Sequence, residues 1–189
     1  MIAATSFLFS FAYDKNTKIL DISNKKIEGI LCLNDFEKLE ELNCSFNEIT
    51  EIINLPYSLK YLNCSNNKIV NLYKLPNDMI GLNCKKNLLN ELYYPFNIKP
   101  NKYPSKLTHL TLGEEFNQPI DNLPNNIEIL KLGKNFNQSI DKLPTSITYL
   151  NYCNTAYYKQ KNQKNIVEEI NAKGMSENLE NNIRERLRL

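Results

Sequence analysis

The chain has 189 residues with 23 basic and 21 acidic side chains, so its net charge at neutral pH is only +2. Such a balance excludes the strongly basic surface typical of proteins that bind nucleic acid or an acidic membrane, and we expect neither as a partner. Hydrophobic residues make up 42% of the chain, enough for a continuous core, but no stretch is long enough to span a bilayer. We therefore expect one soluble domain covering residues 1–189.

The N-terminal segment, MIAATSFLFSFAY at residues 1–13, is apolar and aromatic, and a turn cluster follows it at residues 14–17. It has no positively charged start and no small-residue cleavage site, so we expect a structural cap rather than a signal peptide. Residues 1–22 are predicted to form this cap, as a β-hairpin, together with the first strand.

An apolar pattern of eleven residues recurs along the chain, and its clearest copy is LKYLNCSNNKI at residues 59–69. Apolar residues occupy positions one, four, six and eleven, and asparagine occupies position nine. The spacing returns at residues 39–49 and 79–89, and weaker copies begin at residues 17, 107, 127 and 147. The pattern resembles the LxxLxLxxNxL template of leucine-rich repeats. That resemblance implies a strand-rich leucine-rich-repeat solenoid of the α/β repeat class, with about seven rungs, a parallel β-sheet on the concave face and irregular convex returns.

The units between residues 17 and 92 follow a period close to 20 residues. Asn47, Asn67 and Asn87 occupy position nine, and we expect their amides to bond backbone groups of the neighbouring rung that no sheet ladder reaches. The returns contain Leu-Pro at residues 55–56 and 75–76, which predicts extended or polyproline-like backbone without a helix.

Three of the five cysteines, Cys44, Cys64 and Cys84, occupy position six of the repeat. A disulfide framework uses irregular spacings, whereas a cysteine fixed to a repeat is a small buried hydrophobe. This pattern favours a reducing compartment, and we expect a cytoplasmic protein. A secreted or virion surface repeat protein is the alternative.

The period is interrupted at residues 93–106, which stretch one unit to 28 residues. This segment holds three prolines and four aromatic residues. We expect a loop insertion on the convex side, packed by its own aromatic side chains, and a binding loop is the alternative interpretation.

The units from residue 107 to 152 have a different return. Residues 116–120, FNQPI, and 136–140, FNQSI, are each followed by Leu-Pro. Phe116 and Phe136 are expected to fill the core volume that apolar residues of the convex return fill in the earlier units. The two segments resemble FNIP repeats, a leucine-rich-repeat variant known chiefly from social amoebae and giant viruses of amoebae.

This resemblance implies a viral or protist protein that acts in the cytoplasm of a host or protist cell. Family members in those viruses often carry an N-terminal F-box, which would imply recruitment of substrates to a ubiquitin ligase. The 189 residues contain no F-box, so that function is not carried over. A substrate receptor or adaptor for a ubiquitin ligase that lacks its own F-box is retained as an alternative.

Residues 157–189 are predicted to form a C-terminal helical cap. Apolar residues recur at helical spacing in two stretches, 166–170 and 179–187, and Gly174 separates them. We expect these helices to cover the open end of the solenoid, with a partner-binding helix as the alternative.

Catalytic chemistry finds little support in the sequence. His109 is the only histidine, and its candidate nucleophile is Cys153, two rungs away. Strand and rung spacings place the two side chains about 16 Å apart, whereas a nucleophile and its base need about 3 Å. The repeat cysteines form a line rather than a tetrahedron, which does not suit a thiolate metal site. We therefore predict a protein that is not an enzyme, without catalytic residues, metal or cofactor.

Positions three, five and seven of the repeat alternate with the inward-facing residues and are predicted to form the concave face. The candidate binding residues are Glu41, Asn43, Tyr61, Asn63, Asn83, Lys85, His109, Ile129, Lys131, Tyr149 and Asn151, and Ser45 and Ser65 also stand at position seven. Tyrosines on a rigid sheet suit protein recognition because they bury a large area at low entropic cost. The sequence therefore predicts a protein–protein interaction module that binds a protein partner on its concave face, as a monomer or weak dimer. A solvated face without a partner is the alternative.

Overall fold

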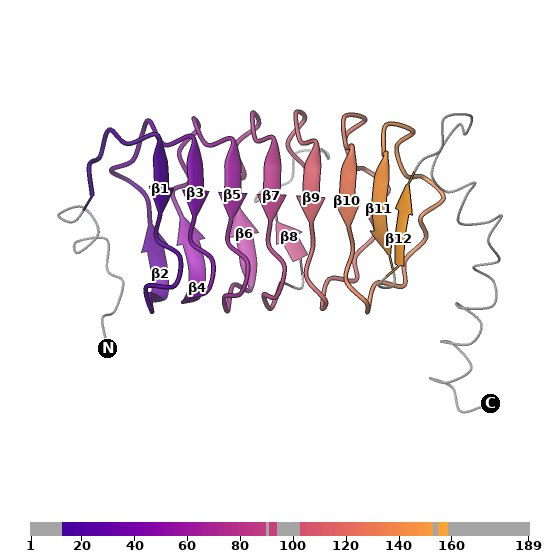
Figure 1. Cartoon of the computed structure of the whole chain (residues 1–189), viewed down its shortest axis with the longest axis horizontal. Helices are drawn as coiled ribbons and strands as arrows, with labels where there is room; N and C mark the ends of the chain where they lie inside the picture. Colours follow the sequence, from indigo (N-terminus) through magenta and orange to yellow (C-terminus); the bar gives the residue numbers. More distant parts are fainter. Residues whose placement is uncertain (1–12, 90, 94–102, 153–154, 159–189) are drawn as a thin grey trace, which may run out of the picture.

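The computed structural model describes residues 13–89, 91–93, 103–152 and 155–158, which form a solenoid of short strands and turns (Figure 1). One eight-stranded sheet runs the length of the solenoid. Its strands are, in spatial order, β1 (Ile19–Asp21), β3 (Glu41–Asn43), β5 (Tyr61–Asn63), β7 (Gly81–Asn83), β9 (His109–Thr111), β10 (Ile129–Lys131), β11 (Tyr149–Tyr152) and β12 (Thr155–Tyr158). The first seven are parallel, and each belongs to one repeat unit. The predicted leucine-rich-repeat solenoid and its seven rungs are confirmed.

The leucine at position four sets the register of this sheet. Each one pairs with the leucine of the next rung and is buried, in the order Leu20, Leu42, Leu62, Leu82, Leu110, Leu130 and Leu150. Because side chains alternate across a strand, burying the central residue of a three-residue strand turns both flanking residues to the concave face.

The convex side is more regular than the sequence predicts. Four of its segments are strands: β2 (Glu28–Cys32), β4 (Glu48–Ile53), β6 (Asn71–Tyr73) and β8 (Glu91–Tyr93). β2 pairs with β4, and β6 with β8, in two small parallel sheets. The extended backbone was anticipated, but the expectation of irregular returns is wrong for these four units. Buried Ile52 and Leu72 anchor β4 and β6 to the core, which holds equivalent segments of adjacent units close enough to pair.

Units from residue 107 onward replace those convex strands with successive tight turns. The amide of Phe116 bonds the carbonyl of Gly113 at 3.3 Å, and the amide of Ile127 bonds that of Pro124 at 3.2 Å. Phe116 and Phe136 are buried and stack in parallel with ring centroids 6.5 Å apart. The aromatic rings therefore occupy the core of these units, as the exchange of volume predicts. A side chain at Gly133 would be impossible, since its Cβ would lie 2.4 Å from the Gly113 carbonyl oxygen.

The asparagines at position nine satisfy backbone groups in two rungs at once, as predicted. Asn67 accepts a hydrogen bond from the amide of Ile49 at 3.0 Å and donates to the carbonyls of Cys44 at 2.9 Å and Cys64 at 3.0 Å. Asn47 and Asn87 repeat this arrangement in the units on either side. These ladders fix the spacing of the rungs and so the geometry of the concave face.

The predicted ends of the solenoid fall largely outside the described residues. The N-terminal hairpin through residue 12 and the helical cap beyond residue 158 lie outside them. Most of the 93–106 insertion, inside the chain, also lies outside the described residues. One correction is possible: Tyr157 and Tyr158, where the helix was expected to begin, lie in β12, antiparallel to β11. Tyr157 is buried opposite Leu150, so the aromatic pair belongs to the sheet. The described residues include no helix with the length and apolar character to cross a membrane.

Candidate functional site

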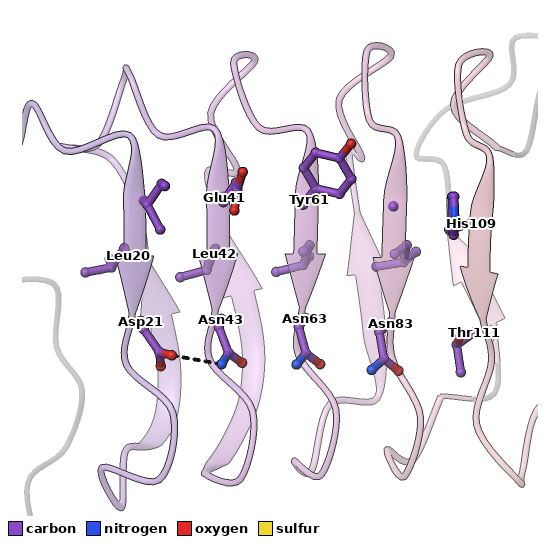
Figure 2. Close-up of a pocket in the computed structure, with 14 residues that line it drawn as sticks. Leu20, Asp21, Glu41, Leu42, Asn43, Tyr61, Asn63, Asn83, His109 and Thr111 are labelled. Atoms are coloured by element: carbon purple, nitrogen blue, oxygen red, sulfur yellow. Dashed lines mark hydrogen bonds between the residues drawn. The ribbon is translucent and has the colours of Figure 1, made fainter.

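The candidate site is the concave face of the eight-stranded sheet. Position-three and position-five side chains of successive strands stand in two rows on this face (Figure 2). A shallow hollow of about 430 Å³ extends over β1, β3, β5, β7 and β9. Since each of these strands has three residues, the strip is only about 10 Å wide.

Asparagines at position five form one of the two rows. Asn43, Asn63 and Asn83 lie side by side on neighbouring strands (Figure 2). Each side-chain oxygen accepts a bond from the backbone amide two residues later, at 3.2 to 3.3 Å. This contact uses the side-chain oxygen and leaves the amide nitrogen available as a donor. Asn43 uses its nitrogen on Asp21 at 3.1 Å, whereas those of Asn63 and Asn83 have no protein acceptor among the described residues.

An aromatic residue and a glycine interrupt the other row. Tyr61 is 43% exposed, and its ring leans over Gly81 on the next strand. A Cβ at Gly81 would lie 2.9 Å from the Cδ1 of Tyr61, so the glycine provides the space that the ring occupies. Beyond it stands His109, which is exposed and whose Nδ1 lies 2.7 Å from the Oγ1 of Thr108. The Tyr61 ring thus takes the place of a side chain at position 81, and His109 is the next side chain in the row.

Charge is divided between the two ends of the strip. Asp21 and Glu41 stand at the β1 end and line the hollow. Hydrogen bonds from the Ser23 hydroxyl and backbone amide lower the pKa of Asp21, so this carboxylate is charged at neutral pH. Farther along the strip, Lys85, which follows β7, and Lys131 on β10 line a second hollow of about 250 Å³.

The β11 end of the strip is aromatic. The Nζ of Lys131 lies 5.7 Å from the centroid of the Tyr149 ring, and this ring meets Tyr158 edge-on at 5.0 Å. Tyr149 is therefore held between a lysine and a second tyrosine, and it is half-buried. Tyr158 itself is 63% exposed.

Most of the predicted concave residues lie on this face, with two corrections. Ser45 and Ser65, at position seven, are buried, because each hydroxyl donates to the asparagine at position five of its own unit. Lys85, at the same position, is exposed, since a long charged side chain does not fit that niche.

Three residues of the face were missed by the sequence analysis. Ile19 and Asp21 flank the leucine of the first, degenerate unit, and the rule used for other units would have found them. Tyr158 was assigned to a helix and has no comparable signal, since it reaches the face only through the antiparallel β12.

The repeat cysteines take no part in the concave face. Cys44, Cys64 and Cys84 are buried, and burial raises the pKa of the Cys44 and Cys84 thiols to about 12. The Cys84 thiol donates to the carbonyl of Thr111 at 3.2 Å, so it acts as a link between rungs. Cys153, the candidate nucleophile that the spacing argument places too far from His109, lies outside the described residues. Within the described ranges, no three histidine, cysteine or acidic side chains are grouped to hold a metal ion.

Comparisons with known proteins show which repeat family and which solved structures this chain is similar to. Residues 116–153 match the family model FNIP Repeat. No curated protein sequence matches the chain. Among solved structures, YopM from Yersinia enterocolitica is 32% identical over 63% of this chain and 24% of its own, with a TM-score of 0.47. CroV588, a circular LRR protein, is 30% identical over 61% of this chain and 17% of its own, with a TM-score of 0.43. The chain thus spans a quarter or less of these proteins.

Proposed function

We propose that this chain, a leucine-rich-repeat protein of the FNIP-repeat type, is a non-enzymatic module that binds a protein partner on its concave face in the cytoplasm of a host or protist cell. One observation carries the proposal. The side-chain amides of the asparagines at position nine bond the backbone of the solenoid, whereas the side-chain nitrogens of Asn63 and Asn83 on the concave strip have no acceptor among the described residues.

These donors are held in fixed positions. Asn63 and Asn83 are oriented by bonds from the backbone of their own units, and the parallel ladder fixes the strands that carry them. Donors fixed in advance lose little conformational entropy when a partner binds. Exposed Tyr61 beside them adds the type of side chain that contributes most to protein interfaces.

Affinity purification from the native cell tests this proposal, with wild type, Tyr61→Ala and Tyr57→Ala compared by mass spectrometry. Tyr57 is the matched control, because this tyrosine is 95% exposed and lines a hollow formed by convex residues. A partner that Tyr57→Ala retains and Tyr61→Ala loses is the expected result. Tyr61→Ala is preferable to a change at Tyr149, whose ring also packs on β12.

Two other results would change the proposal. A partner lost from Tyr57→Ala and retained by Tyr61→Ala would assign binding to the convex side and overturn it. If a ubiquitin-ligase adaptor is recovered together with the partner, the chain is better described as a substrate receptor of that ligase than as an interaction module that acts without a ligase.

A further inference from the structure

We propose that the concave strip takes an extended peptide segment of the partner in one orientation, with a basic residue at the Asp21–Glu41 end and an acidic residue at the Lys85–Lys131 end. This inference rests on the proposed function and specifies the chemistry of the partner. Four observations support it: unpaired charges, two neighbouring hollows, the width of the strip and its length.

Within the described residues, the charged side chains on the strip form no ion pairs, unlike many of those elsewhere on the solenoid. Seven ion pairs occur in the described part of the chain, and every one joins neighbouring units. None of them includes Asp21, Glu41, Lys85 or Lys131. Charges of opposite sign that are separated along one face favour a partner with the complementary order and disfavour the reverse order.

The two hollows are neighbours on the face, since both are lined by Thr111. The larger hollow contains Asp21 and Glu41, the smaller contains Lys85 and Lys131, and Thr111 lines both. Lys134 also lines the smaller hollow, but it pairs with Glu114 at 3.2 Å, so the net positive charge there comes from the two unpaired lysines. The amide donors of Asn63 and Asn83 lie between Glu41 on β3 and Lys131 on β10 and suit the backbone carbonyls of an extended chain.

The shape of the strip favours a peptide over other partners. Its width of about 10 Å admits one extended chain, whereas a globular surface needs a broader area. Carboxylates at one end repel the phosphates of a nucleic acid. The separated charges therefore match a peptide that carries both signs.

The spacing of the charges predicts the spacing of the motif. Glu41 on β3 and Lys131 on β10 are four strands apart in the sheet and differ by two residues along the strand. With about 4.8 Å between strands and about 3.3 Å per residue, the two positions lie roughly 20 Å apart. An extended peptide covers that distance in about six residues. The expected motif has basic and acidic side chains about six positions apart.

The test is selection from a displayed library of random 12-residue peptides against the full chain, followed by binding measurements on a fluorescent copy of the best peptide. The test variant is Glu41→Lys with Lys131→Glu, which keeps the net charge and disturbs no ion pair. The matched control is Glu51→Lys with Lys74→Glu in the convex returns, where neither residue forms an ion pair within the described residues. Thermal unfolding confirms that both variants are folded.

We expect the selected peptides to carry the two charges in one order, about six positions apart. The test variant should bind the peptide at least tenfold more weakly, and exchanging the two charges in the peptide should restore binding. The convex control should bind as wild type does. Unchanged affinity in the test variant, or no rescue by the exchanged peptide, overturns the inference.

The same experiment separates this inference from the proposed function. If no peptide is selected but a protein partner is captured in a Tyr61-dependent manner, the peptide inference fails and the module stands. If peptides are selected and Tyr57→Ala rather than Tyr61→Ala abolishes their binding, the assignment of binding to the concave face is wrong. The peptide inference, which depends on that assignment, is then wrong as well.

Discussion

At the scale of single residues, two asparagines of one unit have opposite uses although they are only four positions apart. Asn87 is buried, accepts from the amide of Ile69 at 3.0 Å and donates to the carbonyls of Cys64 at 2.9 Å and Cys84 at 3.1 Å. The side chain of Asn83 has one hydrogen bond within the described residues, which it accepts from the amide of exposed Lys85. One asparagine therefore stabilises the fold, and the other is available to a partner.

Alanine substitutions at these two positions should separate stability from binding. Asn87→Ala leaves the amide of Ile69 and the carbonyl of Cys84 without this partner and removes one of the two asparagine donors to the carbonyl of Cys64. We expect it to destabilise the protein by about 1–3 kcal/mol. Asn83→Ala removes a bond at the surface, and the loss should stay near 0.5 kcal/mol. Urea unfolding followed by circular dichroism measures both. Equal losses in the two variants would contradict these assignments.

Glu40 gives the solenoid a defined acid dependence. Its carboxylate lies between two lysines of adjacent units, 2.8 Å from the Nζ of Lys18 and in direct contact with Lys60. Hydrogen bonds from Lys18 and then Lys60, with their charges, lower the pKa of Glu40 from 4.5 to about 2. Since the folded-state pKa is the lower one, the stabilisation is complete above 4.5 and is lost as the pH falls toward 2.

We therefore expect Glu40→Gln to lose less stability than wild type on acidification through this range. The measurement is the urea midpoint at a series of pH values from 6 to about 2. At neutral pH the variant should be the less stable of the two, and the curves should converge at the acid end. A constant offset at all pH values would show that Glu40 does not titrate with the assumed pKa.

At the scale of elements, each early unit bends its chain at the same place by a left-handed residue. Position eight is Phe46, Asn66 and Lys86 in successive units, with φ of 56°, 55° and 52°. Asparagine tolerates this region, whereas a bulky aromatic residue is strained there. Burial of the Phe46 side chain offsets little of this strain, because the side chain is 61% exposed.

Phe46→Asn should consequently stabilise the protein, by about 0.5–1 kcal/mol from the relieved backbone. The reciprocal change, Asn66→Phe, should destabilise it by a similar amount. Thermal unfolding of the two variants beside wild type checks the pair. If Phe46→Asn destabilises the protein, the packing of the Phe46 ring must stabilise the fold by more than the backbone strain costs.

Periodicity explains which elements the sequence could predict. Leu42 and Leu62 repeat at a fixed spacing, so the parallel strands and the concave rows follow directly from the pattern. The convex strands could not be predicted in this way, because β2 and β4 pair through backbone groups of separate units and have a bulge after Gly29. Such pairing depends on the distance between stacked units, and the sequence of a single unit does not determine that distance.

The candidate site, like the fold, was predictable only where it follows the period of the repeat. Its rows follow from alternation along the strands, but Ser45 is buried because of a local bond to Asn43 that alternation ignores. Tyr158 reaches the site through an antiparallel strand that breaks the repeat. Contacts inside a unit and departures from the period are the two features that a pattern of spacings leaves out.

At the scale of the whole molecule, bonding connects each unit mainly to its neighbours. The ion pairs, the asparagine ladders and the sheet ladder all join adjacent rungs. Stability in such an array is close to a sum of unit and interface contributions, so damage should spread according to position. β1 has one strand neighbour within the described residues, whereas β5 has two.

Hydrogen exchange should therefore distinguish Leu20→Ala from Leu62→Ala, although each removes a buried leucine from position four. Both substitutions should cost about 2–5 kcal/mol locally. In Leu20→Ala the loss of amide protection should extend from β1 into β3 alone, while in Leu62→Ala it should extend from β5 into both β3 and β7. A uniform loss along the chain in both variants would show that the solenoid unfolds as one cooperative unit.

The long unit between β7 and β9 has a consequence for how such a protein can change over time. Gly81 pairs with His109 across 28 residues in the same register that joins Tyr61 to Gly81 across 20. Chain length between rungs is thus independent of the alignment of the face. New sequence can be inserted there without displacing a contact residue, and whole units can be duplicated to lengthen the strip by about 4.8 Å each. The reach of the surface and the segments attached to it are free to evolve separately.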